Sequence, residues 1–145
     1  TIMGANGDYA DILNLPGGGC RIPVSQKLVD DRMHYLKMNG KETYKQAVTA
    51  MSQASIEALQ KAGLQSSDIA CVIPHQANIR IIEGVSERVG IPMDRFFINV
   101  QKYGNTSAAA VAIALDEASR SGRIRKGDHI MLVAFGGGLT WASSV

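Results

Sequence analysis

The sequence has few of the features that mark membrane, secreted and metal-dependent proteins. Only two of its 145 residues are cysteine, Cys20 and Cys71, and they form neither a CxxC motif nor a disulfide framework. This cysteine usage favours a reducing, cytoplasmic location. No apolar run approaches the about 20 residues that a membrane-spanning helix needs, and no signal-peptide pattern opens the chain. We therefore expect no membrane partner.

Neither the charges nor the glycines indicate a polyanionic ligand. The 15 lysines and arginines are almost balanced by 13 aspartates and glutamates, and this net charge of +2 gives no reason to expect a nucleic-acid partner. The chain contains neither GxxxxGK[ST] nor GxGxxG, so its glycine clusters do not indicate nucleotide phosphate binding. His34, His75 and His129 are scattered without the spacing of metal ligands, and we expect no metal site.

The composition that remains is that of a globular domain. Hydrophobic residues make up 46% of the chain and charged residues 19%, which predicts extensive buried surface, including an interface with another domain or subunit. The length is enough for one domain with its own core. The first residue is Thr1 and not an initiator Met. We therefore expect the chain to be a piece of a longer protein.

Helical and strand patterns alternate along the chain, which predicts an α/β fold. Residues 1–38 are predicted to be a connecting segment with a short strand and a Gly/Pro loop, and residues 39–145 to be the domain. The helix containing "SAAAVAIAL" is apolar nearly all round, so we expect it to be central and covered on most sides. The last two strands are expected to pair antiparallel. The predicted helices span residues 41–62, 78–89 and 106–121, and the predicted strands residues 69–73, 95–100, 129–135 and 139–145.

Three polar or glycine-rich features each follow one of these predicted strands. They are His75 in "IPHQANIR", Asn105 in "KYGNTSAAA" and the "FGGG" run at residues 135–138. Taken singly, each has an ordinary explanation as a structural histidine, a helix cap or a hairpin turn. In open α/β sheets, however, sites form beyond the carboxyl ends of the strands. The joint occurrence of the three features therefore predicts one site at that edge.

The surroundings of His75 predict a neutral imidazole near pH 7. Pro74 lacks an N–H and ends the strand, and the helix that begins near Asn78 points its positive end back toward His75. That field disfavours an imidazolium, and burial acts in the same direction. A neutral histidine that donates one hydrogen bond, paired with the amide of Asn105, is suited to stabilising a developing oxyanion.

The two cysteines make poor nucleophile candidates. A reactive thiolate needs a helix N-terminus or a cationic neighbour, but Cys71 lies within an apolar strand and Cys20 in a Gly loop with no helix start beside it. A thiol hydrolase built on Cys20 and His75 is therefore only a weak alternative.

Three segments together resemble a known family. "PHQANIRII", "YGNTSAAAVAIALDEA" and "AFGGGLTWASS" look like the C-terminal half of β-ketoacyl-acyl-carrier-protein synthase III, and "DYADILNLPGGGCRIP" also matches it. The resemblance covers essentially the whole chain. It implies the C-terminal half of a thiolase-like fold, with a mixed sheet and a buried central helix.

The resemblance also implies an activity and partners. The family joins an acyl-CoA to malonyl-acyl carrier protein in a decarboxylative Claisen condensation that initiates fatty acid synthesis, without a metal or redox cofactor. Acyl carrier protein, acyl-CoA and the N-terminal half of the same enzyme would be the partners, and the intact enzyme would be a homodimer. Electrostatic steering would bring the acidic carrier protein to a basic surface.

The same resemblance implies roles for individual residues. His75 and Asn105 match the catalytic pair that binds the malonyl thioester carbonyl. Gly137 matches an oxyanion-hole glycine and Phe135 an aromatic beside the active centre. The remaining matches are Asn78 and Gly40 along the pantetheine path, and Arg80, Lys45 and Gln76 in carrier-protein docking.

Two departures from the family pattern keep alternatives open. The family's nucleophilic cysteine is absent, so this chain alone is not expected to form an acyl-enzyme, and a non-catalytic binding or assembly module is the second hypothesis. The family often has a basic pair where this chain has Glu87 and Arg88, which leaves Arg80 to carry more of the docking. A condensing enzyme of secondary metabolism, with the same His/Asn pair, is the third hypothesis.

Overall fold

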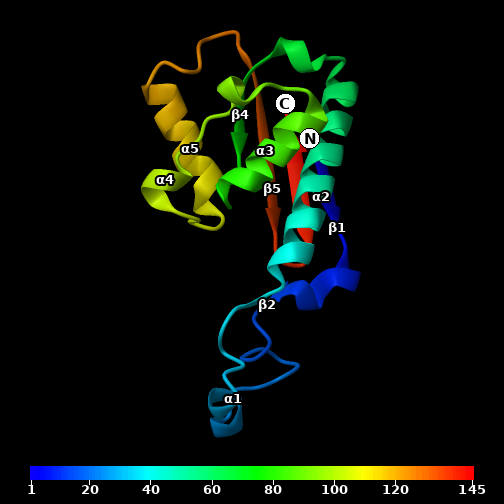
Figure 1. Cartoon of the computed structure of the whole chain (residues 1–145), viewed down its shortest axis with the longest axis vertical. Coiled ribbons are helices and arrows are strands. Elements are labelled where there is room, and N and C mark those ends of the chain that lie inside the picture. Colours follow the sequence, from blue (N-terminus) through cyan, green and yellow to red (C-terminus); the bar gives the residue numbers. More distant parts are fainter.

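The computed structural model describes all residues, 1–145, and centres on one mixed four-stranded sheet. The strand order is β1-β6-β5-β4; β4 and β5 run parallel, and the other neighbours are antiparallel (Figure 1). This confirms the predicted mixed α/β fold and the antiparallel pair at the end of the chain. The strands are β1 (Ile2–Ala5), β4 (Ile69–Pro74), β5 (His129–Gly136) and β6 (Thr140–Ser144).

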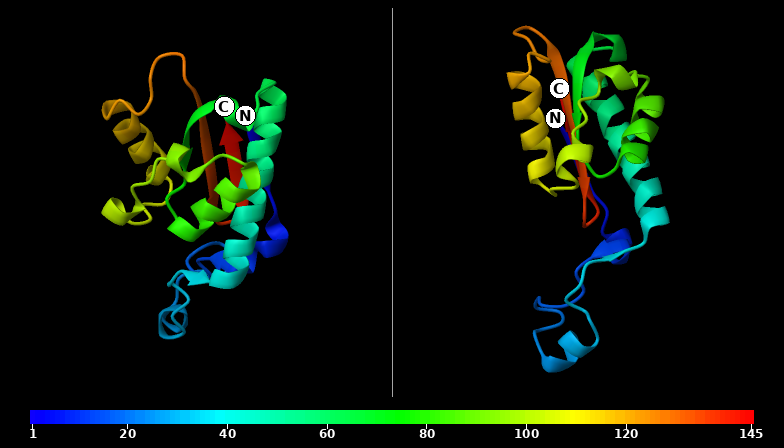
Figure 2. Two further views of the ribbon diagram at one scale, coloured as in Figure 1. Left: turned by 45° about the horizontal axis from the view of Figure 1, so that its top comes forward. Right: turned by 60° about the vertical axis from the view of Figure 1, so that its left-hand side comes forward.

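Helices cover both faces of the sheet, as the edge-on view in Figure 2 shows. Helices α2 (Gly40–Ala62) and α3 (Ile79–Val89) lie on one face, where Met51 and Val85 pack with Val72 of β4 in the main core. Helix α5 (Ala109–Arg120) lies on the other face, where Ala114 packs with Cys71. Successive residues of β4 point to opposite faces, so each face receives its own apolar set.

The two long helices begin and end where their local sequences predict. The Asn39 side chain accepts a hydrogen bond from the N–H of Glu42 at the start of α2, and Gly63 ends that helix with φ at 68°. Asn78 caps α3 in the same way, and Gly90 ends it with φ at 72°. Glycine adopts the left-handed conformation at the lowest energetic cost, which is why both helices end at a glycine.

The first residues of the chain belong to the main sheet. Strand β1 pairs with β6, and the backbones of Asn6 and Leu139 exchange two hydrogen bonds of 2.8 and 2.9 Å. A Cβ atom on Gly4 would lie 2.5 Å from the ring of Trp141, so this strand pair depends on glycine there. The sheet therefore crosses the boundary expected at residue 38.

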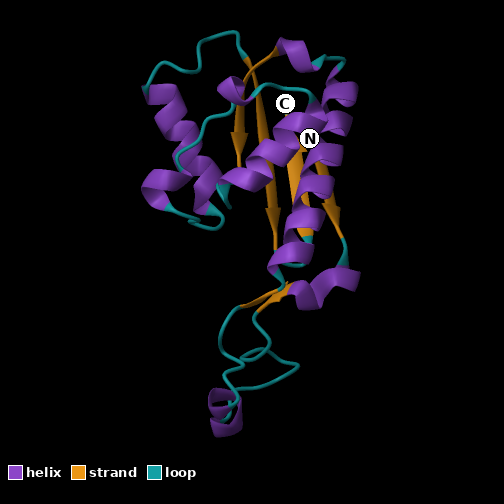
Figure 3. Cartoon of the chain, in the orientation of Figure 1, coloured by secondary structure: helices purple, strands orange, loops and turns teal.

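An extended segment, residues 13–38, projects below the sheet in Figures 1 and 3 and is called the excursion below. It leaves through the short helix η1 (Gly7–Ile12), and β2 (Leu13–Asn14) pairs with β3 (Lys37–Met38) at its neck. Between these strands the chain is a loop apart from α1 (Gln26–Asp30), as the Gly/Pro-rich sequence predicts.

Two expectations need correction. Residues 95–100 do not form a strand: Phe96 makes a single bridge to Val72, flanked by the short helices η3 (Met93–Arg95) and α4 (Val100–Tyr103). Helix α5 is buried along one stripe only, Ala110, Ala114 and Ala118, and its outward face is partly or fully exposed. It is therefore not covered on most sides in this chain. One further short helix, η2 (Ser66–Asp68), precedes β4.

Candidate active site

A cavity of about 1140 Å³ opens where β4 and β5 end. His75, Asn105, Phe135 and Gly137 all line it, so the three strand-end features of the sequence do converge. His75 follows β4, and Phe135 and Gly136 end β5. Asn105 lies in the connection between α4 and α5 and not at the end of a strand. The N-terminal segment closes another side of the cavity with Met3, Gly4, Ala5 and Leu13.

His75 is held by its backbone while its ring is left free. Its N–H donates a hydrogen bond of 2.7 Å to the carbonyl oxygen of Val133 in β5. The side chain is half-buried, and this burial lowers the pKa of His75 below the ordinary value. A lowered pKa keeps the imidazole neutral near pH 7, with one ring N–H available to donate.

Asn105 sits on a tight connection between two helices. Gly104, with φ at 69°, ends α4, and the Asn105 Oδ1 accepts a hydrogen bond of 3.0 Å from the N–H of Ser107. The carbonyl end of the amide is therefore occupied, while the Nδ2 group has no partner within the chain. The arrangement leaves an amide N–H donor in the same cavity as the neutral imidazole.

Phe135 and Gly137 form the wall contributed by the β5–β6 hairpin. Phe135 is 9% exposed and belongs to the main core, so its position is fixed by packing. A Cβ atom on Gly137 would lie 3.3 Å from the carbonyl oxygen of Leu13, a tight contact with the neighbouring segment. A glycine therefore lets the hairpin and the Leu13 segment meet closely at the rim.

A second, smaller depression of about 470 Å³ lies at the start of α2 and α3. Gly40, Asn78 and Arg80 line it together, so the predicted pantetheine and docking positions are neighbours. Asn78 uses its Oδ1 as the cap of α3, at 3.1 Å from the N–H of Ile81. Lys45 is not part of the lining; its side chain is exposed.

No three His, Cys, Asp or Glu side chains come together in a way that could hold a metal ion. None of the helices combines the length and apolar character that crossing a membrane would require.

Comparison with known proteins places this geometry in a family. Residues 59–145 match the family described as 3-Oxoacyl-[acyl-carrier-protein (ACP)] synthase III C terminal. The chain belongs to this family. It is 50% identical over 144 residues to the β-ketoacyl-[acyl-carrier-protein] synthase III of Roseiflexus castenholzii, a match that covers 99% of this chain and 44% of the relative.

Solved structures agree with this assignment. The synthase III of Thermus thermophilus superposes with a TM-score of 0.85 at 47% identity, over 98% of this chain and 43% of that one. The priming β-ketosynthase of the R1128 polyketide biosynthetic pathway gives a TM-score of 0.82 at 34% identity, over 99% of this chain and 42% of that one. The chain thus spans less than half the length of these synthases and corresponds to their C-terminal part.

One of the docking predictions is wrong. Gln76 is 1% exposed and cannot meet a carrier protein. Its Nε2 donates to the carbonyl oxygens of Pro74 and Phe97 at 2.9 and 3.1 Å. Its Oε1 accepts from the N–H groups of Asn99 and Val100 at 3.0 and 3.1 Å. The physical reason is alternation: His75 faces the cavity, and the next side chain points inward to satisfy backbone groups.

Neither cysteine of this chain is a nucleophile for the cavity. Cys71 is fully buried in β4, and burial raises the pKa of its thiol above the ordinary value. Cys20 is exposed and lies in the excursion, outside the lining of the cavity. A Cys20/His75 thiol hydrolase therefore loses its geometric basis.

A polar cluster that adjoins the site was not predicted from the sequence. Asn99 is 4% exposed, and its Nδ2 donates to Glu117 of α5 at 2.8 Å. Glu117 also accepts from Lys102 and Tyr103 of α4. The only local signal was the i,i+3 and i,i+4 placement of Lys102 and Tyr103 after Asn99, because the partner lies 18 residues further along the chain.

Proposed function

We propose that this chain supplies the malonyl-decarboxylating half of a fatty-acid condensing enzyme. The observation that carries the proposal is that His75, whose pKa is lowered by burial, and Asn105, whose Nδ2 has no partner within the chain, line the same cavity. Both would donate to one substrate oxygen there. In this reaction the C–C bond to the malonyl carboxylate breaks and CO2 leaves. The electron pair passes to the thioester enolate, whose oxygen takes the two hydrogen bonds.

The enolate carbon then attacks the carbonyl carbon of an acyl thioester, and the cysteine thiolate that carried the acyl group leaves. That cysteine belongs to the N-terminal half of the enzyme, since neither cysteine of this chain reaches the cavity. Gly137 would offer its backbone N–H to the acyl oxygen, and Phe135 would form the apolar wall beside it.

The substrate arm would enter by the second depression. Gly40 and Asn78 border it and would line the path of the pantetheine chain, and Arg80 stands at its edge. Arg80 and Lys45 would attract the acidic acyl carrier protein. They would contribute mainly by long-range electrostatic steering and less by tight contact.

The test uses the complete enzyme, with this chain joined to its N-terminal half. His75→Ala and Asn105→Ala should each lower CO2 release from malonyl-acyl carrier protein by about 100-fold or more, because each removes one donor to the enolate oxygen. Acylation of the cysteine by acyl-CoA should stay close to the wild-type rate. Normal CO2 release in both variants would refute the proposal.

The match to the priming β-ketosynthase favours one second candidate, the same chemistry in polyketide formation. The His75 and Asn105 roles would be unchanged, and only the carrier protein would differ. Comparing turnover with the carrier proteins of fatty acid and polyketide synthesis distinguishes the two. A non-catalytic module, favoured only by the absent nucleophile, would show no condensation even after the N-terminal half is restored.

A further inference from the structure

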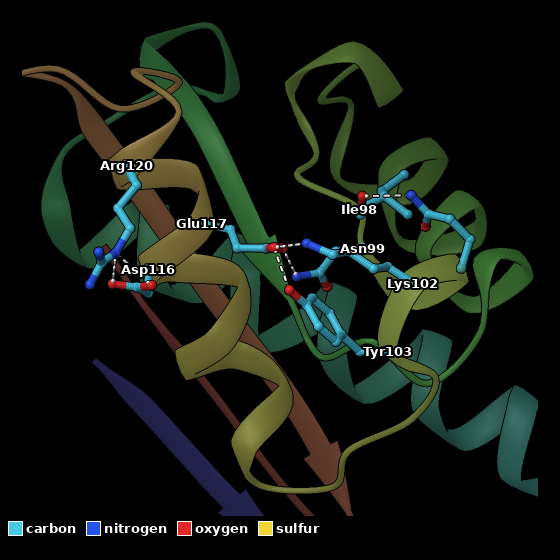
Figure 4. A network of polar contacts seen from close by, with 8 residues as sticks. Ile98, Asn99, Lys102, Tyr103, Asp116, Glu117 and Arg120 are labelled. Carbon is cyan, nitrogen blue, oxygen red and sulfur yellow. Dashed lines mark hydrogen bonds and ion pairs between the residues drawn. The ribbon is translucent and has the colours of Figure 1, made fainter.

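Glu117 joins two consecutive helices that are connected by the loop that carries Asn105. Its Oε1 accepts hydrogen bonds of 2.6 Å from the Nζ of Lys102 and from the hydroxyl of Tyr103, both in α4 (Figure 4). Its Oε2 accepts from the Nδ2 of Asn99 at 2.8 Å. One carboxylate on α5 therefore binds three side chains at the start and end of α4.

The loop containing Asn105 is short. Helix α4 ends at Tyr103 and α5 begins at Ala109, so Asn105 lies two residues beyond a side chain that Glu117 holds. Gly104 and Ser107 both have positive φ, at 69° and 55°, so the loop turns sharply inside this span. Fixing both flanking helices fixes the place from which the Asn105 amide reaches the cavity.

Gln76 connects the same cluster to the other member of the pair. It follows His75 directly and is 1% exposed. Its Oε1 accepts from the N–H groups of Asn99 and Val100, at the start of α4. A continuous set of hydrogen bonds therefore runs from the residue beside His75, through Asn99, to Glu117.

We propose that Gln76, Asn99 and Glu117 are positioning residues that hold the amide of Asn105 at a fixed place relative to the ring of His75. The inference rests on the proposed function of that pair. None of the three residues lines the cavity, so they act through the backbone and not on the substrate. Two donors must meet one oxygen, and a displacement of about 1 Å can cost about 100-fold in rate.

The chain offers a matched control for Glu117. Asp116 is the next residue of α5, and both of its carboxylate oxygens contact the Nε of Arg120, one turn further along the same helix (Figure 4). That pair does not reach α4. Asp116→Ala therefore removes a carboxylate and an ion pair from α5 without releasing the loop that carries Asn105.

The experiment measures two half-reactions in the complete enzyme, well below the melting temperature of each variant. Glu117→Ala should lower CO2 release from malonyl-acyl carrier protein by about 10- to 100-fold. Cysteine acylation should remain at the wild-type rate, and Asp116→Ala should leave both steps unchanged. Glu117→Gln, which keeps one acceptor oxygen, should recover part of the loss. Tyr103→Phe, which removes a single hydrogen bond, provides a milder test if Glu117→Ala fails to fold.

A spectroscopic readout separates positioning from stability. The side-chain amide resonances of Asn105 should shift or broaden in Glu117→Ala and Tyr103→Phe but not in Asp116→Ala. His75→Ala and Asn105→Ala are measured alongside. If these two keep normal CO2 release, the proposed function fails; if they lose it while Glu117→Ala and Tyr103→Phe do not, only the positioning role is overturned. Equal losses of CO2 release and acylation in Glu117→Ala would also overturn it.

Discussion

The N–H of His75 donates a hydrogen bond of 2.7 Å to the carbonyl oxygen of Val133. This bond extends the parallel pairing of β4 and β5 one residue beyond Pro74, which has no N–H to donate. Val133 and Phe135 share one face of β5, because side chains alternate along a strand. His75 is thus anchored at the sheet edge by its backbone, beside the wall that Phe135 forms, and its ring is free for a ligand.

The first prediction concerns the titration of His75. Burial lowers its pKa, so the imidazole should titrate below the ordinary value of about 6.5. Because the unfolded chain binds this proton more readily, the folded state loses stability as pH falls below about 6.5 toward the folded pKa. We expect CO2 release by the complete enzyme to be level from about pH 7 to 8 and to fall in acid as the ring becomes charged. A ring titration by NMR at or above 6.5 would contradict this.

The second prediction ranks two substitutions at Asn105. Asn105→Asp keeps an oxygen for the N–H of Ser107 but removes the Nδ2 donor. Under the proposed function it also places a negative charge beside the developing enolate. It should therefore lower CO2 release at least as much as Asn105→Ala, by about 100- to 1,000-fold. Single-turnover measurement of CO2 release, with cysteine acylation as the control, checks the order. A faster Asp variant would show that the amide does not donate to the reacting oxygen.

The third prediction concerns the pairing of β1 with β6. A Cβ atom on Gly4 would lie 2.5 Å from the Trp141 ring, whereas one on Gly7 would meet no atom within 4 Å. Gly4→Ala should therefore destabilise the complete enzyme by about 1–3 kcal/mol, because overpacking forces the ring or the strand to move. Gly7→Ala is the matched control and should change stability little. Denaturant unfolding followed by the fluorescence of Trp141, the one tryptophan of the chain, provides the measurement.

Local signals explain why much of the fold could be predicted. Asn39 and Gly63 bracket α2, and Asn78 and Gly90 bracket α3, so the information for these boundaries lies within a few residues. The strand ends that meet at the cavity were predictable for a related reason. Parallel strands deliver their carboxyl ends to one edge, whatever the rest of the chain does.

The wrong predictions concern segments whose hydrogen-bond partners lie far away in the sequence. Residues 95–100 look like a strand, but the N–H groups of Asn99 and Val100 donate to the side chain of Gln76 and not to a neighbouring strand. The same contact buries Gln76, which its polar character would place on the surface. Strand β1 is only four residues long, and its partner lies at the other end of the chain.

The fourth prediction concerns acid stability. Hydrogen bonds from Lys102, Tyr103 and Asn99 lower the pKa of Glu117 to about 2. The ordinary value is about 4.3, so this carboxylate contributes stability above about pH 4.3, which is lost as pH falls toward 2. Replacing Glu117 with Gln should therefore lower the melting temperature most at neutral pH and progressively less toward pH 3. Asp116→Asn controls for the loss of a neighbouring charge. A Glu117→Gln deficit that stays constant down to pH 3 would contradict the lowered pKa.

The fifth prediction concerns carrier-protein docking. Arg80 is exposed at the edge of the depression that Gly40 and Asn78 line, so reversing its charge should oppose an acidic partner. Arg80→Glu should raise the KM for malonyl-acyl carrier protein by about 10-fold at low salt, and the difference should shrink near 1 M salt, where the screening length is about 3 Å. The kcat and the KM for acyl-CoA should change little. Arg120→Glu, on α5 at the opposite face of the sheet, is the matched control. An equal rise in KM for the Arg120 variant would show that net charge, and not the position of Arg80, governs docking.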